Sequence, residues 1–388
     1  TAPPAASVTI ERDAAGEPTG VFSEQTMMPI TELTLMRRIP GFTRADRART
    51  LPISCRAYLA YGTTSIFEEH GAATELLRAY QDALAAGTLT VRATLVHSPN
   101  WPALGADVSL EKFVQAWCGF LGEPALGNDY LKMSGLLADF NGQPEDAPRA
   151  SAAPYTGWAG FNYNTALPKD RAEELLMACA RNDIRAIGIW PESIELFWRV
   201  HRKIPLNGRR WVFGHISTLT PREIEQAAAM GLVMTSHTNR HIYKEGHLHK
   251  KRVGDARETE ISPLASLAKA GVPVNLATDN VPVSLFYPVW QSVVRRNRYT
   301  KEIIAPSERL TREQALRNAT INGAYLTFDE TKKGSIEAGK LADLVVLNAD
   351  PLTVADDALK DLYAETTIVG GKIVYERPAG SDPAAALA

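Results

Sequence analysis

Three apolar runs between Arg209 and Pro288 each end at a residue that can do chemistry. The runs, RRWVFGHIS, GLVMTSHTNRH and PVNLATDNVP, lack the polar–apolar alternation of a half-exposed strand, so each predicts a buried parallel strand. His215, His237 and Asp279 stand at the carboxyl ends of these strands. In a barrel of alternating strands and helices, side chains at that end share one mouth and carry the chemistry. We therefore expect the three residues to lie together in a site.

The rest of the chain supplies the elements that must position these residues. Seven segments that predict strands are each followed by a segment that predicts a helix. One helix start is marked by a capping box with proline, Thr220-Pro221-Arg222-Glu223, and one helix end by Gly271. Such alternation indicates a parallel sheet, so we predict an α/β fold of the (β/α)8 barrel type. Seven strands are one short of closure.

The pattern changes after the last of these strands. A helical region that includes residues 311–325 precedes KGSIEAGKLADLVVLNAD and TTIVGGKIVYE, which predict short strands separated by glycine turns. They indicate a small β-structure beside the barrel. We expect a segment over the barrel mouth (1–50), the barrel (51–328), the small β-domain (329–376) and a disordered Ala/Pro-rich tail (377–388).

Composition excludes several functional classes. The 388 residues are 45% hydrophobic and 22% charged, as in a globular protein, and the net charge of −2 argues against a nucleic-acid or membrane-surface role. No run of about 18 apolar residues predicts a membrane span. Cys55, Cys118 and Cys179 show no CxxC spacing, which favours reduced thiols in a cytoplasmic protein. The chain opens at Thr1 without an initiator methionine, so we expect the gene product to start earlier.

The C-terminal part carries a family resemblance. The stretch GSIEAGKLADLVVL (334–347), followed by Asp350-Pro351, resembles the C-terminal signature of the amidohydrolase superfamily. The upstream features GTTSIFEE, Leu131-Lys132, FGHIS and ATDNVPV agree in order. With RDxxGxPTGV near the start, the chain is most similar to the large amidohydrolase branch, amidohydrolase family 3, which includes N-substituted formamide deformylase-like enzymes. The resemblance covers residues 8–376.

The resemblance implies a fold, an activity and metal ligands. It implies strands two to eight of a (β/α)8 barrel with a C-terminal β-sandwich portion, and hydrolysis of a C–N bond with one or two divalent metal ions. Lys132, carboxylated on the fourth strand, His215 on the sixth and Asp279 on the eighth match the family's metal ligands. The first strand with its His-x-His pair is absent from the sequence, and Arg185 stands where the fifth strand has a histidine.

The chemistry explains these residue types. A divalent ion lowers the pKa of water to about 7, and a neighbouring aspartate, here Asp279, acts as the general base. Imidazole and carboxylate ligands suit zinc best, and also nickel, cobalt or manganese. Lys132 can bind a cation only as the carbamate that it forms with CO2. The structural alternatives are a turn cap for Asp279, a hydrogen-bonded core residue for His215 and a solvent-facing strand residue for Lys132.

Three further residues are candidates for substrate binding: His237, Arg185 and His97. Arg185 stays protonated, so it can bind an anionic group but no metal. His97 ends the third strand and could replace a missing ligand, while structural hydrogen bonds are the alternative for both histidines. The pair His247-x-His249 lies beside three cationic residues, and a solvated basic loop is its simpler interpretation.

The expected function is hydrolysis of an amide, carbamate, formamide or cyclic amide in a small organic molecule. The alternative is a degenerate, non-catalytic subunit or small-molecule binding protein, and a third hypothesis keeps the enzyme with a single metal ion. An open barrel exposes strand edges, so we expect a second polypeptide or upstream fragment with the His-x-His strand, in an oligomer. Thr1 as an N-terminal nucleophile is the less economical interpretation of the chain start.

Overall fold

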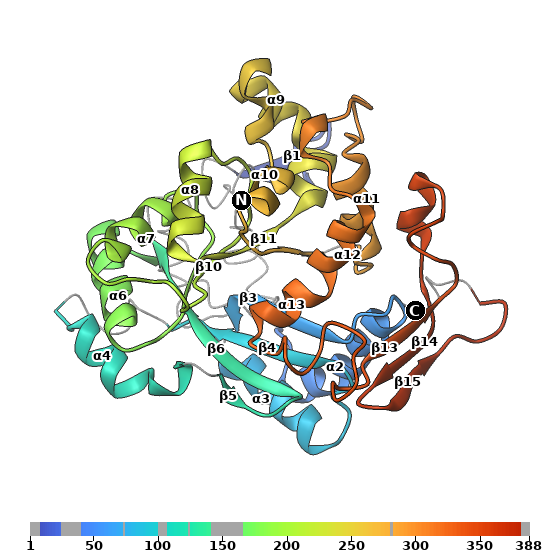
Figure 1. Ribbon diagram of the computed structural model, residues 1–388, viewed down its shortest axis with the longest axis horizontal. Helices are drawn as coiled ribbons and strands as arrows, with labels where there is room; N and C mark the ends of the chain where they lie inside the picture. The colour runs from blue at the N-terminus through green and yellow to red at the C-terminus, as the bar shows by residue number, and fades with distance from the viewer. Residues whose placement is uncertain are drawn as a thin grey trace.

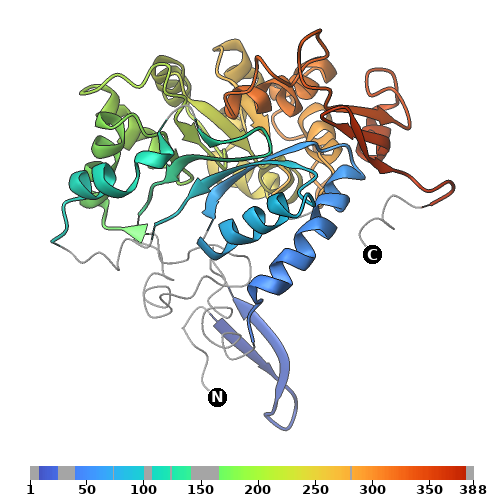
Figure 2. The ribbon, with the colours of Figure 1, turned by 90° about the horizontal axis from the view of Figure 1, so that it is seen from below.

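A computed structural model describes residues 8–24, 40–72, 74–99, 107–122, 125–140, 166–279 and 282–381. Its centre is a curled parallel sheet with the strand order β12-β11-β10-β9-β6-β4-β3 (Figures 1 and 2). The strands are β3 (Ser65–Ala72), β4 (Arg92–His97), β6 (Leu131–Leu137), β9 (Ala186–Gly188), β10 (Val212–Phe213), β11 (Val233–Ser236) and β12 (Val274–Leu276). This confirms the predicted α/β barrel-type fold. Among the described residues β3 and β12 are the two ends of the sheet.

Helix α2 precedes the first strand of the parallel sheet, and the other helices come after that strand along the chain and lie outside the sheet (Figure 1). They are α2 (Arg44–Leu59), α3 (Thr74–Ala85), α4 (Leu110–Trp117), α6 (Lys169–Arg181), α7 (Ser193–His201), α8 (Pro221–Met230), α9 (Gly246–Val253), α10 (Leu264–Lys269), α11 (Phe286–Val294), α12 (Arg312–Ala319) and α13 (Ile321–Leu326). The predicted capping box opens α8, where the Thr220 hydroxyl accepts the Glu223 N–H and the Glu223 carboxylate accepts the Thr220 N–H. α8 ends at Gly231 in the left-handed conformation, which glycine adopts without strain.

The largest core cluster lies between the sheet and helices α4, α6, α7 and α8. Val212, Val233 and Val274 are almost fully buried, as the continuous apolar runs predicted. Trp211 is also fully buried and meets Phe197 of α7 edge to face, with ring centroids 5.0 Å apart. Aromatic pairs in this geometry are worth about 1 kcal/mol beyond their buried area.

A three-stranded antiparallel sheet follows the barrel, formed by β13 (Leu344–Leu347), β14 (Ala364–Val369) and β15 (Lys372–Glu376). Figure 2 shows it at one side of the molecule, next to the end of α2. The Thr367 hydroxyl donates to the Leu59 carbonyl at 2.7 Å, and the Arg92 guanidinium pairs with Asp343 at 2.6 Å. The predicted small β-structure is therefore present, while the exact division of the chain into domains stays a prediction.

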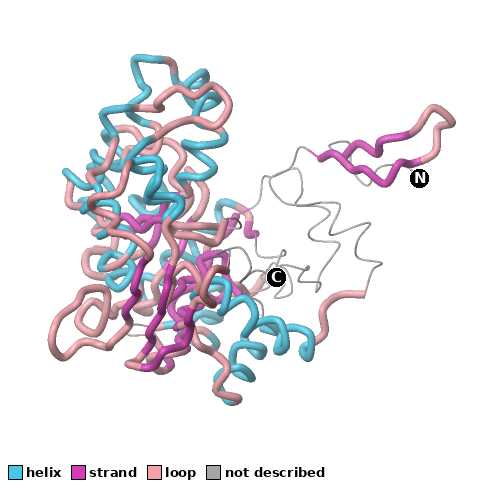
Figure 3. The backbone as a smooth tube through the Cα atoms, turned by 90° about the vertical axis from the view of Figure 1, so that its right-hand side faces the viewer, coloured by secondary structure: helices cyan, strands magenta, loops and turns pink. Residues whose placement is uncertain are grey.

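The N-terminal segment contains a hairpin of β1 (Val8–Arg12) and β2 (Pro18–Glu24). It stands apart from the rest of the described chain (Figure 3). The Asp13 carboxylate closes its turn by accepting the N–H groups of Ala15 and Glu17, each at 2.9 Å. The expectation that residues 1–50 cover the barrel mouth depends on residues 25–39, which lie outside the described residues, as do 382–388 of the tail.

Two sequence-based expectations concern the chain as a whole. Cys55, Cys118 and Cys179 are all buried free thiols, as predicted. In the part of the chain that the structure describes, no helix is both long and apolar enough to cross a membrane.

Candidate functional site

Four side chains meet at the carboxyl ends of the parallel strands. His70 lies in β3, His215 follows β10, His237 follows β11 and Asp279 follows β12. The Nε2 atoms of His70 and His215 are 2.8 Å apart, and the rings of His215 and His237 have centroids 4.1 Å apart. Nδ1 of His237 lies 3.3 Å from Oδ2 of Asp279. We call these four residues the site cluster. The predicted grouping of His215, His237 and Asp279 is thus present.

The backbone at two members of the cluster is unusual. His215 has φ 59° and Asp279 has φ 54°, in the left-handed region that residues other than glycine rarely adopt. His215 lies two residues after the end of β10, and Asp279 lies three residues after the end of β12. Backbone strain of this kind persists where the surrounding packing enforces it, and it concentrates at functional sites.

Two carboxyl groups on β3 support the cluster. Glu69 is buried, accepts the Thr235 hydroxyl at 3.0 Å and lies 3.8 Å from Nε2 of His215. It lies so close to Gly214 that a Cβ at this position would overlap the carboxylate. Burial raises the pKa of Glu69. Burial also raises the pKa of the adjacent Glu68 to about 7, although the hydrogen bond that Glu68 accepts from the His70 N–H acts in the opposite direction.

The protonation states suit ligand binding. Burial, together with the charges of His237 and His70, holds the pKa of His215 well below its usual value, so this imidazole is neutral. Burial opposes ionisation of Asp279, but the hydrogen bond and charge of His237 outweigh it and lower the pKa of this carboxyl group. The cluster therefore places a neutral imidazole beside an ionised carboxylate at neutral pH.

The structure does not bring Lys132 to the site cluster. It is the second residue of β6, and the strand runs four residues further before it pairs with Ala186 of β9. Its ammonium group forms a buried ion pair with Asp329, whose other carboxylate oxygen lies 3.3 Å from Lys333. The structure therefore pairs the Lys132 side chain with Asp329 and not with the site cluster, and its role as a carbamate ligand stays a prediction.

Arg185 also lies away from the cluster. It immediately precedes β9 and is fully buried, donating to the Leu326 carbonyl and the Ser134 hydroxyl, each at 2.6 Å. Phe213 of β10 pairs with Gly188 of β9, so the position across from His215 lies beyond Gly188. The predicted equivalence of Arg185 with a ligand at the strand end does not match this register.

His97 lies at the correct end of the sheet but outside the cluster contacts. It is the last residue of β4, paired with Ala72 of β3, and its ring contacts Phe120 edge to face. Burial lowers its pKa to about 4, and its Nδ1 atom is buried without a hydrogen-bond partner. A position near the mouth agrees with substrate binding, which stays a prediction.

Sequence reasoning missed His70 and Glu69. The signal was present, because the run SIFEEH places two carboxylates and an imidazole in succession after an apolar strand. The apolar part of this stretch predicts a strand that ends at Glu69, whereas β3 continues to Ala72 and includes His70.

The donor set of the site cluster fits a divalent metal ion. Three imidazoles and a carboxylate form a chain of contacts that runs from His70 through His215 and His237 to Asp279. The pKa of His215 is lowered, and so is that of Asp279. Imidazole nitrogen and carboxylate oxygen are the ligands that zinc and its neighbours prefer.

Comparisons with known proteins agree with this geometry. An N-substituted formamide deformylase from Arthrobacter pascens is 38% identical over 121 residues, which are 30% of this chain and 22% of that protein. A putative amidohydrolase of Bacillus subtilis (strain 168) is 23% identical over 381 residues, 95% of this chain and 68% of its own. The structure of an atrazine chlorohydrolase from Arthrobacter aurescens TC1 complexed with zinc superposes with a TM-score of 0.54 at 16% identity, over 94% of this chain and 84% of the other.

These matches differ in what they show. The formamide deformylase match spans less than a quarter of that protein, and the likeness to the chlorohydrolase shows the fold alone. A family model described as "Amidohydrolase family", in contrast, matches residues 1–375. The resemblance of residues 334–351 is thereby confirmed, and the chain belongs to the amidohydrolase family.

Proposed function

We propose that this chain hydrolyses a C–N bond, in an amide, carbamate, formamide or cyclic amide, of a small organic molecule. The observation that carries the proposal is the site cluster, in which His70, His215, His237 and Asp279 meet at the carboxyl end of the sheet. The similarity to a formamide deformylase supports the choice of bond.

Three residues of the cluster would hold a divalent metal ion, most favourably zinc: His70, His215 and Asp279. When bound, such an ion supplies a Lewis acid that polarises the scissile carbonyl and lowers the pKa of water to about 7. Nickel, cobalt and manganese accept the same donors.

Asp279 is the general base of this proposal. Its side chain is 39% exposed, so substrate and water reach it, and its lowered pKa keeps it ionised. It takes a proton from the attacking water and returns it to the leaving nitrogen. Nδ1 of His237 lies 3.3 Å from the Asp279 carboxylate. In this proposal His237 orients that carboxylate and contacts the substrate.

A single metal ion is favoured over a pair. A two-metal site of this family needs a carboxylated lysine, and Lys132 is occupied in the ion pair with Asp329. Lys132→Arg keeps that ion pair and cannot form a carbamate, so we expect it to retain metal content and activity. Loss of one metal equivalent and of activity in a folded Lys132→Arg protein would instead show a carbamate role.

The function is tested by metal analysis and a panel of N-substituted formamides, carbamates and cyclic amides. Asp279→Asn should lower kcat about 10²–10⁴-fold, the range of general acid–base catalysis. Unchanged turnover in this variant would remove Asp279 from the mechanism. A folded, metal-free protein that hydrolyses no member of the panel would favour the non-catalytic alternative.

We further propose that an additional strand, from a second polypeptide or an upstream segment, closes the sheet between β3 and β12. The support is that these strands end the sheet among the described residues. The cytoplasmic location and the oligomeric state stay predictions.

A further inference from the structure

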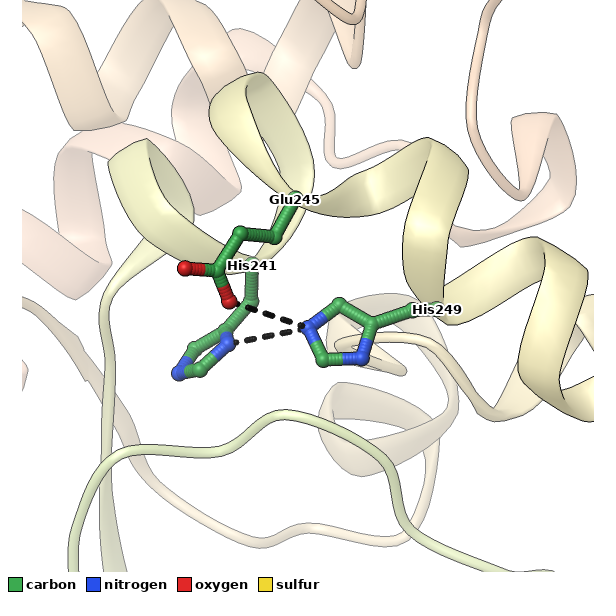
Figure 4. A group of neighbouring side chains, drawn as sticks. All are labelled: His241, Glu245 and His249. Atoms are coloured by element: carbon green, nitrogen blue, oxygen red, sulfur yellow. Dashed lines mark hydrogen bonds and ion pairs between the residues drawn. The ribbon is translucent and has the colours of Figure 1, made fainter. Parts of the chain in front are cut away.

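A second group of metal-binding side chains lies beyond β11. The π-helix η4 (Asn239–Lys244) follows His237 and leads into α9. The side chains of His241 in η4, Glu245 at the junction of the two helices and His249 in α9 point toward one another (Figure 4). The three residues are spaced four apart in the sequence. Nδ1 of His241 lies 3.2 Å from Nε2 of His249, and a Glu245 oxygen lies 3.9 Å from the same Nε2. We call these three residues the outer triad.

These distances match those of a metal site. Two nitrogen ligands at tetrahedral positions about 2.05 Å from zinc are roughly 3.3 Å apart. The three donor atoms of the outer triad all lie within 4.8 Å of one another. The spacing alone therefore needs little rearrangement to surround an ion.

The two imidazole rings of the outer triad are buried from solvent and uncharged. His241 is 6% exposed and His249 8% exposed, so the expected solvated loop at His249 is not what the structure shows. The Nε2 atom of His241 is buried and has no hydrogen-bond partner. Burial lowers the pKa of both rings, so both imidazoles are neutral at neutral pH.

Two arginines oppose a cation here. Arg240 donates to both Glu245 oxygens at 3.1 and 3.2 Å, and Arg252 lies 3.0 Å from Nδ1 of His249. In the Arg240–Glu245 pair both side chains are more than a third exposed, and Arg252 is exposed as well. Solvent-exposed pairs of this kind contribute little to stability, so coordination of a metal ion can displace them. When Nε2 of His249 binds a metal, Nδ1 carries the proton, so Arg252 must turn away.

We propose that His241, Glu245 and His249 bind a second divalent transition-metal ion of the zinc, cobalt or nickel class, separate from the site cluster. The role of this ion is structural: it ties η4 to α9. Because the His241 N–H donates to the His237 carbonyl at 3.0 Å, that tie also supports the backbone at His237. The inference stands independently of the proposed hydrolysis.

The experiment titrates the metal-stripped protein with Zn²⁺ and Co²⁺, and counts bound equivalents by elemental analysis after desalting. His249→Ala should lose one equivalent and the Co²⁺ absorption bands of that site. The Glu245 side chain is partly exposed, so Glu245→Gln is a milder substitution, and it should weaken that binding about tenfold. Arg252→Ala should strengthen it about tenfold by removing a competing charge, while the neighbouring Lys251→Ala should behave as the wild type.

The opposite results would overturn the inference. A folded His249→Ala protein with the same metal count as the wild type rejects the site. If His249→Ala does not fold, unchanged affinity in Glu245→Gln rejects it. If Arg252→Ala gains no affinity and only loses stability, the triad is a hydrogen-bond chain held by Arg252. His215→Ala separates the two sites, because it removes metal from the site cluster and leaves the outer triad loaded.

Discussion

At the scale of the residue, the backbone of His215 is informative. Its φ of 59° lies in a region where a side chain costs about 1 kcal/mol or more compared with glycine. Glycine would satisfy the turn, so local stability does not select a histidine here. The presence of a histidine at position 215 is explained by the contacts of its side chain with His70 and His237.

A matched pair of substitutions measures this strain. His215→Gly should unfold with a free energy about 1 kcal/mol higher than His215→Ala, although both lose the imidazole. Urea denaturation of the metal-free proteins measures the difference. If the alanine variant is equally stable or more stable, the left-handed backbone at 215 carries no strain.

A second prediction at this scale concerns pH. The pKa of His97 is lowered from its unfolded value to about 4 by burial. As the pH falls, His97 therefore takes up a proton in the unfolded chain before it does so in the folded protein. The contribution of neutral His97 to the free energy of unfolding is complete above about pH 6.5 and is lost between about pH 6.5 and 4. His97→Gln should remove a decline on the order of 2 kcal/mol across this window.

The comparison of both proteins at pH 8 supplies the control, because both side chains are then neutral and only the packing difference remains. Denaturation curves at pH 8, 6 and 4.5 measure the effect. A parallel acid decline in wild type and His97→Gln would place the acid sensitivity in other groups.

At the scale of the element, the sequence predicted strands better than strand ends. Continuous apolar runs such as those ending at Ser236 and Leu276 indicated buried strands, and these are present. Whether a polar residue lies at the catalytic end depends on where a strand begins and on its register with its neighbours. Neither is encoded in an apolar run. The structure places Lys132 near the start of β6 and Arg185 just before β9, while His70 lies near the carboxyl end of β3, one residue beyond the predicted strand.

Glu69 of β3 and Thr235 of β11 pack so closely against Gly214 that they leave no room for a side chain at this position. A Cβ at this position would overlap the Glu69 carboxylate and come within 3.1 Å of the Thr235 hydroxyl. Gly214→Ala should therefore lower the free energy of unfolding by about 1–3 kcal/mol, as overpacking of a core does. Thermal or urea denaturation measures it.

Gly119→Ala is the matched control, since a Cβ there meets nothing within 4 Å. Its effect should stay within about 0.5 kcal/mol. The double variant Gly214→Ala, Glu69→Ala should recover part of the loss, and no recovery would mean that backbone strain rather than the carboxylate is responsible.

At the scale of the whole molecule, one ion pair joins the barrel to the C-terminal sheet. The side chains of Arg92 and Asp343 are each 4% exposed, and Asp343 also accepts the Gly370 N–H at 2.8 Å. Asp343→Ala should lower the free energy of unfolding by about 3–5 kcal/mol, because it leaves a buried guanidinium without its counter-charge.

Denaturant unfolding of a double-mutant cycle tests this. Arg92→Met combined with Asp343→Leu should cost less than Asp343→Ala alone, since no uncompensated charge stays buried. Additive losses would show that the two residues act separately and that the two parts are joined by other contacts.

The His70–His215 contact has a mechanical consequence for the molecule. Among the described residues β3 is an edge strand of the sheet, and β10 lies four places along the strand order from it. The contact therefore connects two strands that are not neighbours in the sheet. A metal ion bound by both imidazole rings would fix the position of β3 relative to β10. Removal of the ion would allow β3 to move away from the rest of the sheet. Amide exchange in β3 should then rise when the protein is stripped of metal, so that the shape of the scaffold follows the occupancy of the site.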